Sequence, residues 1–201
     1  MSLVQFFPGL DRLTVLLVDD NSHMLHIVRT MMRGFGIVHI FESRDPAEAI
    51  DIARNDSIDL IILDYQMDML DGLEFTRMLR TAADSHNRFV PIILLTAYTE
   101  RSRILSARDA GVTEICAKPI NASELWRKIA ACVNEPRPFV RTKTFFGPDR
   151  RRRTIEWPAE KERRKTPIEA PQPQAPDGET APKAAGEAAS QAAEATLEQA
   201  G

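Results

Sequence analysis

Five short apolar runs, separated by amphipathic stretches, organise the first two thirds of the chain. The runs are Leu13–Val18, Ile37–Phe41, Leu60–Leu63, Val90–Leu95 and Thr113–Cys116. Four of them are almost continuous in Val, Ile and Leu, which is typical of strands covered on both faces. The pattern therefore predicts a parallel β-sheet buried between layers of helix.

The intervening segments carry the spacing and boundary signals of helices. We predict helices over 22–33, 46–54, 72–82, 100–110 and 122–134. Asp45 before Pro46 and Asn121 before the last segment are N-cap signals, and Gly111 is a C-terminal stop. Five strand–helix units in about 125 residues predict one open α/β domain.

Polar residues follow the predicted strands where each strand ends. Asp19 and Asp20 follow the first strand, Asp64 the third, Thr96 the fourth and Lys118 the fifth. Functional groups collect beyond the carboxyl ends of parallel strands, and neighbouring strands lie only ~5 Å apart. We therefore expect these side chains to meet in one pocket.

Three carboxylates in one pocket repel each other, and a divalent cation with oxygen ligands can hold them together in the ionised state. Mg²⁺ is favoured because it binds through few carboxylates and leaves positions for phosphate oxygens. Asp64 could then act as a nucleophile that forms an acyl phosphate, with Thr96 and Lys118 meeting the charge on the phosphoryl group. The alternative is that the aspartates only cap loops.

The motifs at these positions carry a family resemblance. Asp19 and Asp20 lie in Val-Leu-Leu-Val-Asp-Asp-Asn, Asp64 in Leu-Ile-Ile-Leu-Asp, Thr96 precedes Ala97, and Lys118 precedes Pro119. In order and spacing, residues 11–135 resemble the receiver domain of two-component response regulators, the family typified by CheY. The resemblance implies a flavodoxin-like fold with a five-stranded parallel sheet in the order 2-1-3-4-5 and helices on both faces.

The same resemblance implies a site chemistry. Asp64 would be the phosphoacceptor, and Mg²⁺ would be bound by Asp20, Asp64 and the backbone carbonyl of Gln66, with Asp19 acting through a bound water. The chain would be a stand-alone signalling protein in a phosphorelay, not an enzyme with a separate substrate. A histidine kinase or histidine phosphotransfer protein would donate the phosphoryl group. A degenerate receiver that serves only for docking is the alternative.

The output of such a domain depends on residues that sense the phosphoryl group, here Thr96 and Lys118, and on a protein that docks near strands 4 and 5. Two positions depart from the family pattern. Asp68 stands where Pro is common, and Ile115 stands where the family usually has a Tyr or Phe switch. Tyr98, two residues after Thr96, is the candidate replacement for that aromatic ring.

Charge divides the chain into three regions. The 201 residues have a formal net charge of −3, but residues 1–136 carry −5, residues 137–165 carry +7 and residues 166–201 carry −5. We predict a receiver domain over 11–135, a basic extension over 137–165 and a disordered tail over 166–201. The tail is rich in Ala, Pro, Glu and Gln, which cannot bury enough apolar surface to offset the ordering entropy. The folded part is predicted to end near Pro136.

The basic extension interleaves arginines with aromatic residues. The guanidinium group of arginine can donate two hydrogen bonds to a phosphate or to the edge of a guanine base, and aromatic rings stack on bases. The segment resembles the arginine-rich extension of Cle-type CheY-like proteins, which implies binding of cyclic di-guanylate. The implied contacts are Arg141, Asp149, Arg150, Arg151, Arg152, Arg153 and Trp157. A solvated charge run and non-specific nucleic-acid binding are the alternatives.

Several function classes are disfavoured by the sequence. No stretch approaches the ~20 apolar residues that cross a bilayer, and the first residues lack signal-peptide features, so we expect a cytoplasmic protein. Cys116 and Cys132 fit no disulfide scaffold or zinc spacing, and we expect both to be reduced and buried. His23 and His26 are more simply exposed residues than a metal pair. No helix-turn-helix pattern follows residue 136, so we expect no DNA-binding domain.

Overall fold

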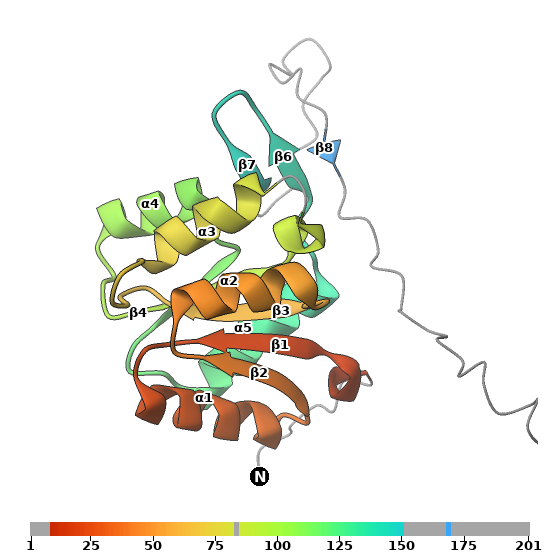
Figure 1. The fold of residues 1–201 in the computed structure, drawn as a ribbon, viewed down its shortest axis with the longest axis vertical. Coiled ribbons are helices and arrows are strands. Elements are labelled where there is room, and N and C mark those ends of the chain that lie inside the picture. Colours follow the sequence, from red (N-terminus) through yellow and green to blue (C-terminus); the bar gives the residue numbers. More distant parts are fainter. Residues whose placement is uncertain (1–8, 83–84, 151–167, 170–201) are drawn as a thin grey trace, which may run out of the picture. The chain divides into compact units, whose positions relative to one another are not determined.

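The computed structural model describes residues 9–82, 85–150 and 168–169. Its centre is a five-stranded parallel sheet in the order β2-β1-β3-β4-β5 (Figure 1). The strands are β1 (Thr14–Val18), β2 (His39–Ser43), β3 (Leu60–Asp64), β4 (Ile92–Thr96) and β5 (Glu114–Ala117). The predicted fold and strand order are therefore confirmed.

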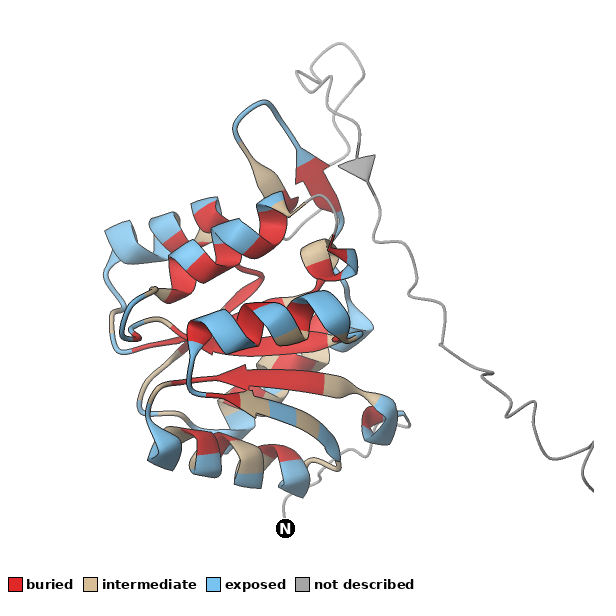
Figure 2. Cartoon of the chain, in the orientation of Figure 1, coloured by how far each residue is buried: buried red, intermediate tan, exposed pale blue. Residues whose placement is uncertain are grey.

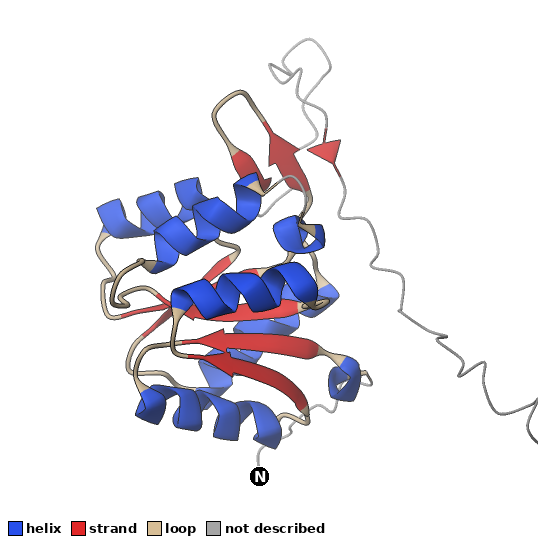
Figure 3. Ribbon diagram, in the orientation of Figure 1, coloured by secondary structure: helices blue, strands red, loops and turns tan. Residues whose placement is uncertain are grey.

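Helices cover both faces of this sheet (Figure 3). They are α1 (Ser22–Gly34), α2 (Pro46–Asn55), α3 (Gly72–Thr81), α4 (Arg101–Ala110) and α5 (Ala122–Asn134), with short 3-10 turns at Leu10–Arg12 and His86–Phe89. One buried apolar cluster joins the sheet to α2, α3 and α4, and a second joins it to α1 and α5. Alternate residues of the central strands supply the two clusters, so these strands are buried along their length (Figure 2).

The predicted boundary signals act as expected. The Asp45 side chain accepts a hydrogen bond from the backbone N–H of Ala47, with Pro46 in the first turn of α2. Asn121 caps α5 in the same way, through the N–H of Ser123. Gly111 ends α4 with φ at 101°, a left-handed conformation that favours glycine.

Two strands begin two residues later than predicted: the second at His39 and not at Ile37, and the fourth at Ile92 and not at Val90. The Ile37 side chain is fully buried, but its backbone N–H donates to the carbonyl of Met32 and closes the end of α1. Its apolar side chain serves the helix–sheet core before the chain enters the sheet. Ile37 was therefore predicted to be a strand residue only because its side chain is apolar and buried.

The prediction that the folded part ends near Pro136 is wrong. Residues Phe139–Arg141 (β6) and Phe146–Pro148 (β7) form an antiparallel hairpin, and Ile168–Glu169 (β8) pairs with the other edge of β6. Phe139 is only 3% exposed. The segment is basic on average, so the prediction gave too little weight to its few apolar side chains, which pack against the receiver fold. Apart from β8, the tail predicted to be disordered lies outside the described residues.

Along the part of the chain that the structure describes, we find no helix with the length and apolarity needed to cross a bilayer.

Both cysteines are buried and free, as predicted. Burial raises the pKa of the Cys132 thiol from its ordinary value of 9.0 to about 12, and it also raises the pKa of Cys116. At a given pH below 9, the thiolate fraction of Cys132 is then about a thousandfold smaller than that of a free thiol.

We expect iodoacetamide to label neither cysteine in the native protein and both in urea, as measured by intact mass. Rapid native labelling would contradict this burial.

Candidate functional site

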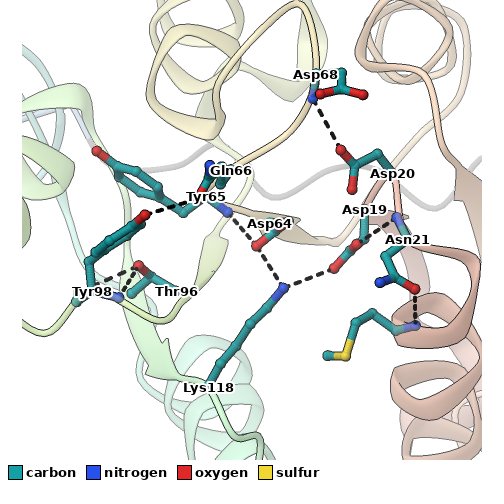
Figure 4. Close-up of polar contacts among 11 residues, drawn as sticks. Asp19, Asp20, Asn21, Asp64, Tyr65, Gln66, Asp68, Thr96, Tyr98 and Lys118 are labelled. Carbon is teal, nitrogen blue, oxygen red and sulfur yellow. Dashed lines mark hydrogen bonds and ion pairs between the residues drawn. The ribbon is translucent and has the colours of Figure 1, made fainter.

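Three carboxylates lie together at the carboxyl ends of β1 and β3 (Figure 4). Oxygen atoms of Asp19, Asp20 and Asp64 all lie within 4.8 Å of one another. The two strands are parallel neighbours with Val18 opposite Leu63, so the residues that follow these two emerge side by side. Asp19 and Asp64 are buried and Asp20 is partly exposed. The predicted convergence of the three carboxylates is confirmed.

Lys118 reaches into this carboxylate group from the end of β5. Its Nζ lies 2.8 Å from Oδ1 of Asp64 and 3.2 Å from Oδ2 of Asp19. Burial opposes the charge on Lys118, but its hydrogen bonds to the two aspartates and their charges raise its pKa overall. Burial is also the largest influence on Asp64, and it raises the pKa of this carboxyl although Lys118 acts in the opposite direction. The lysine therefore bridges two buried carboxylates as a stable cation.

The donor set fits a divalent cation. One ammonium group faces three carboxylates, which leaves an excess of negative charge, and every available ligand atom is a hard oxygen. Backbone N–H groups orient the carboxylates: Asn21 donates to Asp19, Tyr65 to Asp64 and Asp68 to Asp20. A hollow of about 320 Å³ opens beside Asp20, Asp64 and Lys118 and offers room for phosphate oxygens.

The predicted metal residues are only partly tested by this arrangement. Within the described ranges, these three aspartates form the only cluster of three or more possible ligands, so His23 and His26 do not belong to one. Both histidines lie on the exposed side of α1, as expected. Gln66 lines the hollow, and the use of its backbone carbonyl as a ligand stays a prediction.

Thr96 is buried at the end of β4, directly before Ala97 and Tyr98, which line the hollow. Its hydroxyl oxygen accepts a hydrogen bond of 2.9 Å from the backbone N–H of Tyr98, and the hydroxyl donates to the carbonyl of the same residue at 3.4 Å. The phenol of Tyr98 donates to Oε1 of Gln66 at 3.0 Å, which links the β4–α4 loop to the β3–α3 loop (Figure 4). Tyr98 thus forms one wall of the hollow.

Sequence reasoning missed two side chains that hold Tyr98 in place. The Tyr65 ring meets the Tyr98 ring edge-on, with centroids 5.7 Å apart. The Arg103 guanidinium lies 4.5 Å from the Tyr98 ring centroid and donates to the Tyr65 hydroxyl at 2.8 Å. Ile115 lines the space beneath Tyr98. Tyr65 adjoins Asp64 in sequence and could have been suspected, but no sequence signal marked Arg103.

The described part of the basic extension places its arginines against aromatic rings. Arg141 lies 5.1 Å from the centroid of Phe146, and Arg150 lies 4.6 Å from that of Phe145. The backbone N–H of Asp149 donates to the carbonyl of Pro138. Arg151, Arg152, Arg153 and Trp157 lie outside the described residues, so binding of cyclic di-guanylate stays a prediction.

Comparison with known proteins shows which family this fold belongs to. The family model described as "Response regulator receiver domain" matches residues 15–130. The chain is 30% identical over 115 residues to chemotaxis protein CheY of Pseudomonas aeruginosa. The aligned region covers 57% of this chain and 91% of that relative. It is equally similar to CheY-3 of Vibrio cholerae, with 57% of this chain and 87% of the relative covered.

Two solved structures are also similar. The chemotaxis response regulator CheY4 of Vibrio cholerae has a TM-score of 0.56 and 26% identity, over 60% of this chain and 98% of that one. The receiver domain of sensor histidine kinase PA1611 from Pseudomonas aeruginosa has a TM-score of 0.55 and 29% identity, over 61% of this chain and 98% of that one. That structure holds a magnesium ion in its active-site cleft. The family match ends before the β6–β7 hairpin.

Proposed function

Because the chain belongs to the response regulator receiver domain family, we propose that it accepts a phosphoryl group on Asp64 in a phosphorelay and signals through protein contacts. One observation carries the proposal: the Lys118 ammonium lies 2.8 Å from Oδ1 of Asp64, inside a pocket shared with Asp19 and Asp20. The donor would be a histidine kinase or a histidine phosphotransfer protein. An output protein would dock on the face around β4 and β5.

The chemistry follows from these groups. An Asp64 carboxylate oxygen attacks the phosphorus of a phosphohistidine, the P–N bond breaks, and its electron pair stays on the imidazole nitrogen. Lys118 offsets charge on the transferred oxygens, and Thr96 can donate to one of them once its hydroxyl turns from Tyr98. Asp20, Asp64 and the Gln66 carbonyl would hold Mg²⁺, with Asp19 acting through a water. The bound ion supplies further neutralisation of phosphate charge.

The test is incubation of the full chain with acetyl phosphate and Mg²⁺, followed by intact mass measurement. We expect a single phosphoryl adduct that hydroxylamine removes, as it does an acyl phosphate. Chelation of the metal is expected to lower the yield at least about tenfold, because the pocket then lacks the cation that neutralises phosphate charge.

The docking-only alternative predicts a different result. A chain that circular dichroism shows to be folded, but that forms no adduct, would contradict the proposed function and favour a degenerate receiver. An adduct that resists hydroxylamine would also contradict it, because the modified group would not be an acyl phosphate.

A further inference from the structure

Helix α4 is held at both ends by contacts of different kinds. At its first turn, Arg103 stacks on Tyr98 and donates to Tyr65, the two rings beside the phosphoacceptor pocket. At its last turn, Asp109 pairs with Arg150 at 2.7 Å, directly after the β6–β7 hairpin. One helix therefore joins the carboxyl-end pocket to the basic extension.

The hairpin meets the end of α4 through close backbone packing. A Cβ atom built on Gly147 would lie 2.9 Å from the Cα of Gly111, and one built on Gly111 would lie 3.2 Å from the carbonyl oxygen of Phe146. No side chain fits between these two glycines. The end of α4 therefore packs directly against the backbone of β7.

Helix α4 is also the most weakly anchored helix of its face. Its only buried side chains are those of Ala107 and Ala110, and the rest of its surface is partly or fully exposed (Figure 2). In contrast, α3 buries Leu73, Phe75 and Leu79. Because burial of apolar area sets the cost of moving a helix, α4 can shift at a lower cost than its neighbour.

We propose that the β6–β7 hairpin is an output element of this receiver, and that phosphorylation of Asp64 loosens it through α4. The inference rests on the proposed function. When the Thr96 hydroxyl donates to a phosphoryl oxygen, it releases its contact with the Tyr98 backbone, and the Tyr98 ring moves with its loop. Arg103 follows that ring, and α4 shifts against the hairpin.

The contact that must break is suited to a switch. Arg150 and Asp109 are each about half exposed, with side-chain exposures of 40% and 56%, so solvent screens their attraction. A small displacement of α4 is enough to separate them. The coupling is reciprocal, so a loosened hairpin also changes the equilibrium of the phosphoacceptor site.

Hydrogen–deuterium exchange of the full chain, with and without acetyl phosphate and Mg²⁺, tests the proposal. In the phosphorylated protein we expect amides of residues 139–147 to exchange at least about threefold faster. In Asp109→Asn, the hairpin should exchange fast before phosphorylation and respond no further, while the adduct still forms. The exposed Asp51→Asn on α2, which breaks an ion pair with Arg54, is the matched control and should behave like the wild type.

Intact mass measured on the same samples separates the possible failures. An adduct on Asp64 without any change in hairpin exchange would overturn the inference and leave the proposed function standing. If the hairpin amides of unphosphorylated Asp109→Asn exchanged at the wild-type rate, the proposed link between the pocket and the hairpin through α4 would be overturned. Absence of the adduct would overturn both proposals.

Discussion

Asp64→Asn is expected to reduce the phosphoryl adduct to less than about a hundredth of the wild-type level. The amide has nearly the volume of the carboxyl group, but it is neutral and is not a nucleophile toward phosphorus. Intact mass after incubation with acetyl phosphate and Mg²⁺ is the measurement. The variant should stay folded, since burial raises the pKa of Asp64 and the fold thus already disfavours its charged form.

Asp68→Asn is the matched control for this substitution. Asp68 lies four residues further along the same loop, its side chain is exposed, and its contact with Asp20 is made by the backbone N–H. We expect its adduct yield to stay within about threefold of the wild type, because Asp68 borders the hollow but is not one of the three clustered carboxylates. A full-yield adduct in Asp64→Asn would show that Asp19, Asp20 or another residue is the acceptor.

The sheet and its pocket could be predicted because both depend on local patterns. Continuous apolar runs mark strands buried on two faces, and the strand order followed from the family resemblance. The pocket residues come directly after strands, so strand position alone brought Asp19, Asp64 and Lys118 together. Strand limits shifted by one or two residues, as at Ile37, because a buried side chain does not show which backbone partner its N–H will find.

Two features escaped prediction because they depend on contacts between distant segments. Arg103 supports Tyr98 from the first turn of α4, and a charged residue there looks like an ordinary exposed residue. The hairpin depends on Arg80, which occurs in a charged helical segment and is nonetheless only 3% exposed. A buried arginine can be recognised only when its acceptors, which lie up to 31 residues away, are known.

Arg80→Met is expected to lower the free energy of unfolding by about 3 kcal/mol, the cost of breaking a buried hydrogen-bond network. The guanidinium donates to the carbonyls of Arg88, Val90 and Gly111 at 2.8, 2.7 and 3.2 Å, and it lies 5.0 Å from the ring centroid of Phe139. Burial lowers its pKa to about 9, so it remains charged at neutral pH. Methionine fills much of the volume but leaves three carbonyls without a donor.

Urea unfolding followed by far-ultraviolet circular dichroism measures this loss, and Arg77→Met is the control. Arg77 lies on α3 three residues earlier with its side chain exposed, so its replacement should change stability by no more than about 0.5 kcal/mol. Equal stability of the two variants would show that the Arg80 network contributes little. The expected loss includes the receiver core as well as the hairpin, because Arg80 connects the segment before β4 and the end of α4 to the Phe139 ring. A hairpin that loosened alone in Arg80→Met, with the stability of the core unchanged, would show that Arg80 holds the hairpin without stabilising the core.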